Sequence, residues 1–193
     1  EVSGTVHEVG PDVDDFQVGD RLVGSGGNGG YSTHTISKAD TVFKIPDEVT
    51  FELAAAFPAV YLTSYLMVIH PGDLQPGESI LIHGAAGGVG LAATELAKIA
   101  GAKTIFGTCS PSKHDFISDN GVLPLDRDNF LSEIMDWTNG KGIDLVLDPI
   151  GGEHLMKSYR CLGSGGRVCS FGISDMAPSK SKSQWARFKS WMT

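Results

Sequence analysis

The sequence lacks the features that mark several large classes of protein. Its 193 residues include only 3 cysteines, none in a Cys-x-x-Cys pair, which argues against a disulfide framework or a structural zinc knot. Every apolar run is broken well short of the ~20 residues that a membrane-spanning helix needs. No basic and apolar secretion signal opens the chain. We therefore expect a globular, cytoplasmic protein in a reducing compartment.

Basic side chains are scarce and unevenly placed. The net charge of −8 argues against nucleic-acid binding. Residues 1–78 hold 3 basic and 12 acidic side chains, whereas residues 79–193 hold 12 and 11, so the net charges of the two segments are −9 and +1. The second segment therefore suits a phosphorylated cofactor better than the first.

Patterns typical of metal ligands and nucleophiles are also missing. The 6 histidines show no close ligand spacing, so each is predicted to be a surface or packing residue. They are His7, His34, His70, His83, His114 and His154. Ser164 lies between turn glycines and not in a Gly-x-Ser-x-Gly nucleophile elbow. These absences are consistent with chemistry supplied by a bound cofactor.

The pattern of apolar residues changes near residue 50. Residues 1–46 contain short strand-like segments between turns, among them EVSGTVHEVG, VGDRLVG, YSTHTISK and TVFKIP. Residues 51–70 have helical spacing, with Pro58 expected to separate two helices. We predict two domains, residues 1–50 and residues 51–193. Because the chain begins and ends within such patterns, we expect a fragment of a longer protein.

From Ser79 onward, strand-like and helical segments alternate, which is typical of a parallel, doubly wound α/β sheet. The five expected strands span residues 80–83, 104–108, 122–125, 143–148 and 167–171. The expected helices span residues 89–100, 112–120, 129–138 and 153–162. Gly101 and Gly121 stand where helices commonly end.

The stretch HGAAGGVG, residues 83–90, lies where the first of these strands meets the first helix. It keeps the second and third glycines of the Gly-x-Gly-x-x-Gly dinucleotide fingerprint, with Ala85 in place of the first. Glycine lets the backbone approach a ligand, and N–H groups at a helix start favour an anion such as a pyrophosphate. We expect a dinucleotide-binding loop. A glycine-rich turn that binds nothing is the alternative.

The end of the second expected strand discriminates between cofactors. An NAD site needs an acid ~20 residues after the loop to hold the ribose 2′-hydroxyl, but residues 101–111 contain none. Ser110 and Lys113 stand there instead, and a hydroxyl with an ammonium suits a 2′-phosphate. This indicates NADPH. The alternative is that Ser110 or Ser112 caps a helix and Lys113 is a solvated charge.

The chain resembles the zinc-independent quinone oxidoreductase branch of the medium-chain dehydrogenase/reductase superfamily. The resemblance is carried by VGDRL, AAAFPAVYLTSYLMV, QPGESILIHGAAGGVGLAATELAK, GTCSPSKH and GGRVCSFG. It extends to the vesicle amine transport protein homologues through FGTCSPSKHDFISDNGV, GIDLVLDPIGGE and KSQWARFKSWM. It implies a Rossmann-type sheet preceded by part of a GroES-like β domain, NADPH as cofactor, and hydride transfer to a quinone or α,β-unsaturated carbonyl. We also expect a homodimer.

The resemblance further implies which positions touch the cofactor. The nicotinamide end would lie beside Thr63, Phe171 and Gly172. The pyrophosphate would lie against Gly87, Gly88 and Val89. The 2′-phosphate would lie against Ser110 and Lys113.

At two places the sequence departs from patterns found in its relatives. Arg127 stands where many quinone oxidoreductases have a tyrosine near the adenosine phosphate, and it either clamps the phosphate or faces solvent. Zinc-dependent relatives have a cysteine ligand just before the nicotinamide threonine, but residues 58–63 contain no Cys, His or carboxylate. We therefore expect no metal. The family's substrate-facing residues lie largely upstream of Glu1, so no catalytic residue is assigned.

The last segment suggests a rival function. Residues 176–193 carry four basic side chains, no acid, and aromatic residues at roughly helical spacing. Basic charge beside aromatic anchors favours an anionic lipid surface. The alternative to a reductase is therefore a nucleotide-binding protein with peripheral association to vesicle or mitochondrial outer membranes and with weak or no catalysis. A helix docked on the rest of the protein would explain the same pattern.

Overall fold

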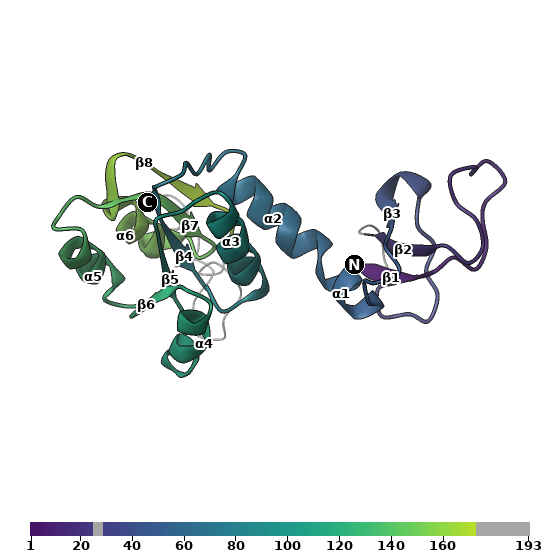
Figure 1. Cartoon of the computed structure of the whole chain (residues 1–193), viewed down its shortest axis with the longest axis horizontal. Helices are drawn as coiled ribbons and strands as arrows, with labels where there is room; N and C mark the ends of the chain where they lie inside the picture. Colours follow the sequence, from purple (N-terminus) through teal and green to yellow (C-terminus); the bar gives the residue numbers. More distant parts are fainter. Residues whose placement is uncertain (25–28, 173–193) are drawn as a thin grey trace, which may run out of the picture. The chain divides into compact units, whose positions relative to one another are not determined.

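The computed structural model describes residues 1–24 and 29–172 (Figure 1). These residues form two compact units, of which the first is Glu1–Leu62 and the second begins at Thr63. No helix in the described ranges is long and apolar enough to cross a membrane. Residues 176–193, which carry the membrane-surface hypothesis, lie outside the described residues.

The first unit is built on a three-stranded antiparallel sheet. Its strands are β1 (Val2–Thr5), β2 (Arg21–Gly24) and β3 (Val42–Lys44), in the order β1-β2-β3. The strand expected in YSTHTISK is wrong, because residues 29–38 contain only turns and irregular backbone. Tyr31 and Ile36 remain exposed there, so the apolar positions of this segment have no buried surface to occupy within the described residues.

Two helices follow the small sheet. Helix α1 (Phe51–Ala56) begins after Thr50, whose hydroxyl accepts a hydrogen bond from the Leu53 N–H. Helix α2 (Pro58–Val68) starts at Pro58, which confirms the expected separation. Proline is tolerated there because the first N–H groups of a helix have no partner within the helix. The division between the two units falls inside α2, after Leu62.

The second unit contains a five-stranded parallel sheet, which confirms the predicted α/β fold class. Its order is β6-β5-β4-β7-β8, so the chain winds outward in both directions from β4. The strands are β4 (Ser79–His83), β5 (Thr104–Thr108), β6 (Leu123–Leu125), β7 (Ile143–Asp148) and β8 (Leu162–Ser170). Strand β8 begins earlier than expected, because Leu162 pairs with Ile143 and the register then shifts across a glycine-rich stretch.

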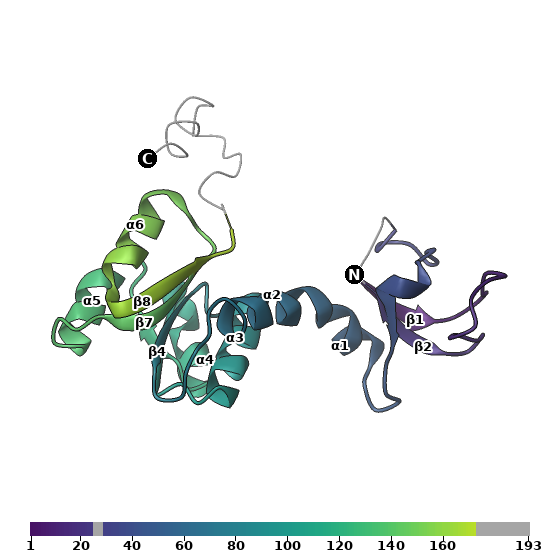
Figure 2. The same cartoon turned by 90° about the horizontal axis from the view of Figure 1, so that it is seen from above.

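Helices cover both faces of this sheet (Figure 2). They are α3 (Gly88–Ile99), α4 (His114–Asp119), α5 (Phe130–Trp137) and α6 (Gly152–Arg160). Successive side chains of a strand point to opposite faces. Ile80 and Ile82 of β4 therefore pack in one apolar cluster with residues of α3 and α4, whereas Leu81 packs in a second cluster with residues of α5. His83 shares the face of Leu81.

Candidate cofactor site

The C-terminal ends of β4, β5 and β6 surround a pocket of about 200 Å³. This is the edge at which open α/β sheets bind ligands, because loops from neighbouring parallel strands meet there. Its lining residues come from the three loops that follow these strands: Gly84, Ala86, Gly87, Cys109, Ser110, Lys113 and Arg127. The structure therefore brings together four of the residues that the sequence predicts for the cofactor, from Gly87 to Arg127.

The loop after β4 is a tight turn fixed at both ends. Gly84 has a φ of 71°, which favours glycine, and its carbonyl accepts a hydrogen bond from the Gly87 N–H at 2.9 Å. The Ala85 N–H donates to the Thr108 carbonyl at 3.0 Å, which ties the loop to β5. Helix α3 starts at Gly88, so its positive dipole end lies beside the pocket and favours an anion.

Gly87 and Gly90 are each required for a different steric reason in this loop. A Cβ on Gly87 would come within 3.2 Å of the Gly84 carbonyl oxygen and within 4 Å of nothing else, so a side chain there would project into the pocket. A Cβ on Gly90 would collide with the Gly84 carbonyl and lie 2.6 Å from the Ala85 Cα. Gly87 thus keeps the pocket open, whereas Gly90 lets α3 pack against its own entry turn.

The other wall of the pocket carries positive charge. Lys113 and Arg127 are both exposed, and neither is in an ion pair with another described residue. Ser110 precedes a 3₁₀ turn (Pro111–Lys113), and its hydroxyl makes no capping hydrogen bond. Burial raises the pKa of the Cys109 thiol, while the charges of Lys113 and Arg127 oppose that change. Both cations therefore act on this pocket, and Arg127 is exposed at its wall.

Asp126 and Asp128 flank Arg127 in the sequence, and the Asp126 carboxylate makes hydrogen bonds to the backbone. The Asp126 Oδ1 atom accepts hydrogen bonds from the N–H groups of Asp128 and Asn129 at 2.9 and 3.0 Å. These are the residues just before α5, so this carboxylate holds the entry to that helix. Among the described residues, none that lines the pocket is acidic.

The remaining predicted residues lie outside this pocket's lining. Thr63 is half-buried in α2, next to Ser64, whose hydroxyl donates to the Val89 carbonyl at 2.9 Å. Phe171 follows β8, and its N–H donates to the Asp148 carbonyl at 3.1 Å. A Cβ on Gly172 would lie 2.9 Å from the Pro149 Cα, so glycine allows these two loops to touch. Cofactor contacts at Thr63, Gly88, Val89, Phe171 and Gly172 stay predictions, as do those at the four predicted residues that line the pocket.

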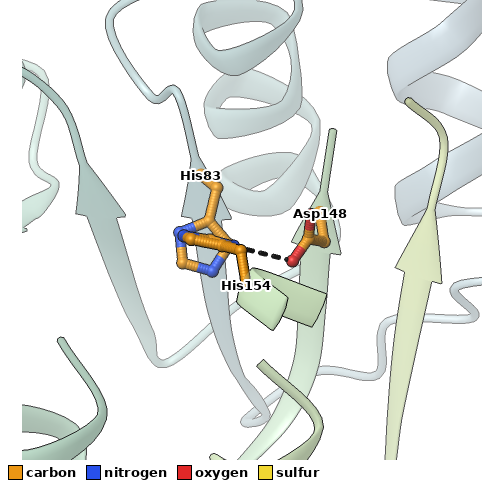
Figure 3. Close-up of side chains that lie close together, drawn as sticks. All are labelled: His83, Asp148 and His154. Carbon is orange, nitrogen blue, oxygen red and sulfur yellow. Dashed lines mark hydrogen bonds and ion pairs between the residues drawn. The ribbon is translucent and has the colours of Figure 1, made fainter. Parts of the chain in front are cut away.

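A buried polar cluster that the sequence did not predict lies beside this loop (Figure 3). His83 ends β4, Asp148 ends the adjacent strand β7, and His154 comes from α6. The two imidazole rings lie 4.3 Å apart between centroids, and the His154 Nδ1 lies 3.0 Å from the Asp148 Oδ2. The sequence spacing of the histidines does not predict this meeting of His83 and His154, and their expected role as packing residues and not metal ligands stays a prediction.

The hydrogen bonds of this cluster have one consistent direction. The Asp148 Oδ2 atom accepts from the His154 Nδ1–H at 3.0 Å and from the Ser158 hydroxyl at 2.7 Å. Because Ser158 donates to Asp148, its oxygen accepts from the His83 Nε2–H at 3.1 Å. The His83 Nδ1 then accepts from the Thr108 hydroxyl at 2.9 Å. This direction is that of a neutral His83 with its proton on Nε2, the form that its burial favours.

Two pKa values agree with this assignment. Burial, helped by the nearby charges of His154 and Arg127 and opposed by that of Asp148, lowers the pKa of His83 to about 3. Burial alone would raise the pKa of Asp148, but hydrogen bonds from His154, Ser158 and the N–H groups of Gly151 and Ile150 hold it well below its ordinary value. The cluster therefore pairs a neutral imidazole with an ionised carboxylate.

Ligand atoms of His83, Asp148 and His154 all lie within 4.8 Å of one another, so their spacing alone would admit a metal ion. The hydrogen bonds argue otherwise. Both nitrogens of His83 and the Oδ2 of Asp148 are already paired within the protein. A metal would have to displace those partners, so the cluster fits a hydrogen-bond network better than a zinc site.

Comparisons with known proteins agree with this architecture. The zinc-binding dehydrogenase family matches residues 88–190, and the alcohol dehydrogenase GroES-like domain matches residues 1–47. The synaptic vesicle membrane protein VAT-1 homolog of Danio rerio is 39% identical over 193 residues, which cover 99% of this chain and 40% of that protein. The human protein of the same name is 37% identical over 99% of this chain and 49% of its own length. The chain thus spans less than half of these relatives.

Solved structures share the fold. The CurK enoyl reductase superposes with a TM-score of 0.83 at 34% identity, over 97% of this chain and 56% of that one. A quinone oxidoreductase from Pseudomonas syringae pv. Tomato DC3000 has a TM-score of 0.83 at 32% identity, over 97% and 59%. A mycobacterial protein complexed with NADPH has a TM-score of 0.81 at 29% identity, over 97% and 59%. Because the family match alone covers more than half of its residues, the chain belongs to the zinc-binding dehydrogenase family of the medium-chain dehydrogenase/reductase superfamily.

Proposed function

We propose that this chain belongs to an NADPH-dependent, zinc-independent oxidoreductase that transfers hydride to a quinone or an α,β-unsaturated carbonyl. Residues 51–193 are its cofactor-binding domain, residues 1–50 are part of its GroES-like catalytic domain, and the whole protein is a homodimer. The observation that carries the proposal is the pocket at the strand ends, which is lined by Lys113 and Arg127 and, within residues 1–24 and 29–172, by no acid.

The charge of the pocket favours NADPH over NADH. A carboxylate that holds the ribose 2′-hydroxyl of NADH would repel a 2′-phosphate, whereas an ammonium and a guanidinium attract it. Ser110 adds a hydroxyl without a capping bond at the same wall. The pyrophosphate would lie at the start of α3, where Gly87 leaves the backbone open.

The substrate class rests on the named neighbours and on the kind of site. One neighbour is an enoyl reductase and another is a quinone oxidoreductase. A bound nicotinamide supplies the hydride in such chemistry, and the protein binds and orients the reactants. The role of this chain is therefore to hold the phosphates of the cofactor and to fix the loops around them.

Replacement of Lys113 tests the proposal directly. We expect Lys113→Ala to weaken NADPH binding by roughly tenfold to a hundredfold, because a charge-assisted contact to phosphate contributes about 1.5–3 kcal/mol before solvent screening. NADH binding should stay nearly unchanged, since NADH has no 2′-phosphate. Isothermal titration calorimetry of both nucleotides against the full protein measures the difference.

Lys103→Ala is the matched control for this experiment. Lys103 is also exposed, but it precedes β5, whereas Lys113 follows the C-terminal end of that strand. The control should bind both nucleotides like the wild type. Equal wild-type affinity for NADPH and NADH, or an equal loss of both in Lys113→Ala, would contradict the proposed role of this lysine.

We predict that the purified protein carries no stoichiometric zinc, although its family is named for that metal. Residues 58–63 contain no Cys, His or carboxylate, and the His83 nitrogens and the Asp148 Oδ2 already make hydrogen bonds within the protein. Elemental analysis after gel filtration should give far less than one zinc per chain, and a chelator should change neither the Tm nor the reductase activity. About one zinc per chain would refute this expectation.

A further inference from the structure

The buried cluster forms a continuous hydrogen-bonded line across the sheet. The line runs from the Thr108 hydroxyl to His83, from His83 to Ser158, and from Ser158 to Asp148. Its three bonds join β5 to β4, β4 to α6, and α6 to β7. His83 is 2% exposed, and Ser158 and Asp148 are fully buried, so water does not compete for these bonds.

One end of this line adjoins two loops of the candidate site, and the other end adjoins the loop after β7. Gly84, which opens the phosphate loop, follows His83, and the pocket residues Cys109 and Ser110 follow Thr108. At the other end, the Asp148 Oδ1 accepts from the N–H groups of Ile150 and Gly151 at 2.7 and 2.9 Å. The line thus connects the loops that follow three neighbouring strands.

Packing alone does not require these polar groups. An apolar side chain would fill a buried position at the end of β4, as Leu81 does two residues earlier on the same face. An ionised carboxylate is costly to bury unless donors surround it. Asp148 has four: two backbone N–H groups, the Ser158 hydroxyl and the His154 Nδ1–H. Such a satisfied network makes one arrangement of the attached loops strongly preferred.

We propose that His83 is a positioning residue for the cofactor site. Its hydrogen bond with Thr108 fixes the phosphate loop relative to the start of the Ser110–Lys113 loop. Its hydrogen bond with Ser158, which in turn donates to Asp148, fixes the phosphate loop relative to the loop after β7. The inference rests on the proposed function, because the positioned loops are those assigned to the cofactor. Phe130, which packs on the rings of His83 and His154 at 4.6 and 5.0 Å between centroids, shields the network from the side of α5.

The first test removes one hydroxyl and then restores it. Thr108→Val keeps the shape of the side chain but takes away the donor to the His83 Nδ1, and Thr108→Ser keeps the donor. We expect Thr108→Val to lower the affinity for NADPH and for NADH by about tenfold each, because the phosphate loop serves both nucleotides. Thr108→Ser should retain most of the wild-type affinity. Calorimetric titration of both nucleotides gives these values.

Val146→Ala is the control for a merely structural effect. Val146 is fully buried in β7 on the same face of the sheet, but it contributes no hydrogen-bonding side chain. Its loss should reduce the free energy of unfolding and leave both affinities close to wild type at temperatures where the protein is folded. Val146→Ala weakening both nucleotides as much as Thr108→Val would overturn the positioning role, as would wild-type affinities in Thr108→Val.

The second test needs no cofactor. Ser158→Ala interrupts the line in its middle, so amide hydrogen exchange in the free protein should speed up in residues 84–90 and in residues 150–152 together. Unchanged exchange in both segments would overturn the inference even if cofactor binding is as proposed. If the wild type bound neither nucleotide, the proposed function and the cofactor role of His83 would both fail, and exchange would report only whether the two loops are coupled.

Discussion

Gly87→Val is expected to reduce the affinity for NADPH and for NADH by about a hundredfold or more, because the new side chain fills the space that the pyrophosphate needs. A Cβ at this position meets only the Gly84 carbonyl oxygen, at 3.2 Å, and otherwise points into the open pocket. The native backbone at Gly87, with a φ of −91°, suits any residue. The fold should therefore survive, and calorimetry of both nucleotides measures the loss.

Gly90→Ala is the comparison variant, because it is expected to affect stability and not the space of the pocket. Its Cβ would lie 2.6 Å from the Ala85 Cα inside the packed turn, so it should lower the free energy of unfolding in urea by about 2 kcal/mol or more. Gly87→Val should lower that free energy much less, because its Cβ is close only to the Gly84 carbonyl oxygen, at 3.2 Å. A Gly87→Val protein that binds either nucleotide with wild-type affinity would show that the phosphates do not pass this glycine.

Acid is expected to destabilise the protein between pH 7 and pH 5, above the ordinary pKa values of the carboxyl groups. The pKa of His83 is about 3 in the folded protein and 6.5 as its ordinary value, so between these limits the unfolded chain binds a proton that the folded chain does not. Stability is therefore fully present above pH 6.5 and falls as the pH drops toward 3. Linkage gives a loss of about 2 kcal/mol between pH 7 and pH 5.

Urea unfolding at several pH values, followed by circular dichroism, tests this expectation. The lowered pKa values of the Glu78, Asp148 and Asp20 carboxyls act only below their ordinary values of 4.5 and 3.8, so they do not interfere above pH 5. His83→Leu removes the titrating group and should flatten the curve between pH 7 and pH 5, although it lowers stability at pH 7. An equally steep fall in His83→Leu would show that another group causes the loss.

Much of the fold follows from local patterns in the sequence. Pro58 separates two helices because its ring is compatible only with a helix start. Gly101 and Gly121 follow helices with φ values of 83° and 73°, which few other residues adopt. The alternation of strands and helices implies parallel pairing with helices on both faces. The sequence predicts a shorter β8, since the glycines before Arg167 carry no apolar alternation, but the backbone of β7 pairs with the strand from Leu162.

The pocket was predictable in part for the same reason. Loops after neighbouring parallel strands meet at one edge of the sheet, so Gly87, Ser110, Lys113 and Arg127 needed only the correct strand boundaries to be brought together. The sequence also contains one signal for the buried polar cluster of His83, Asp148 and His154. His83 and Asp148 are both polar residues that close apolar strands, and such residues share the edge where the loops gather.

The sequence by itself determined the fold class, the dinucleotide-type loop and the missing acid after the second strand, because each depends on residues close together in the chain. Only the tertiary structure decided that β4 lies between β5 and β7, and therefore that His83 meets Thr108, Ser158 and Asp148. Strand order and the direction of each side chain are set by how the helices pack on the two faces of the sheet. That packing depends on the whole chain at once, and no short segment encodes it.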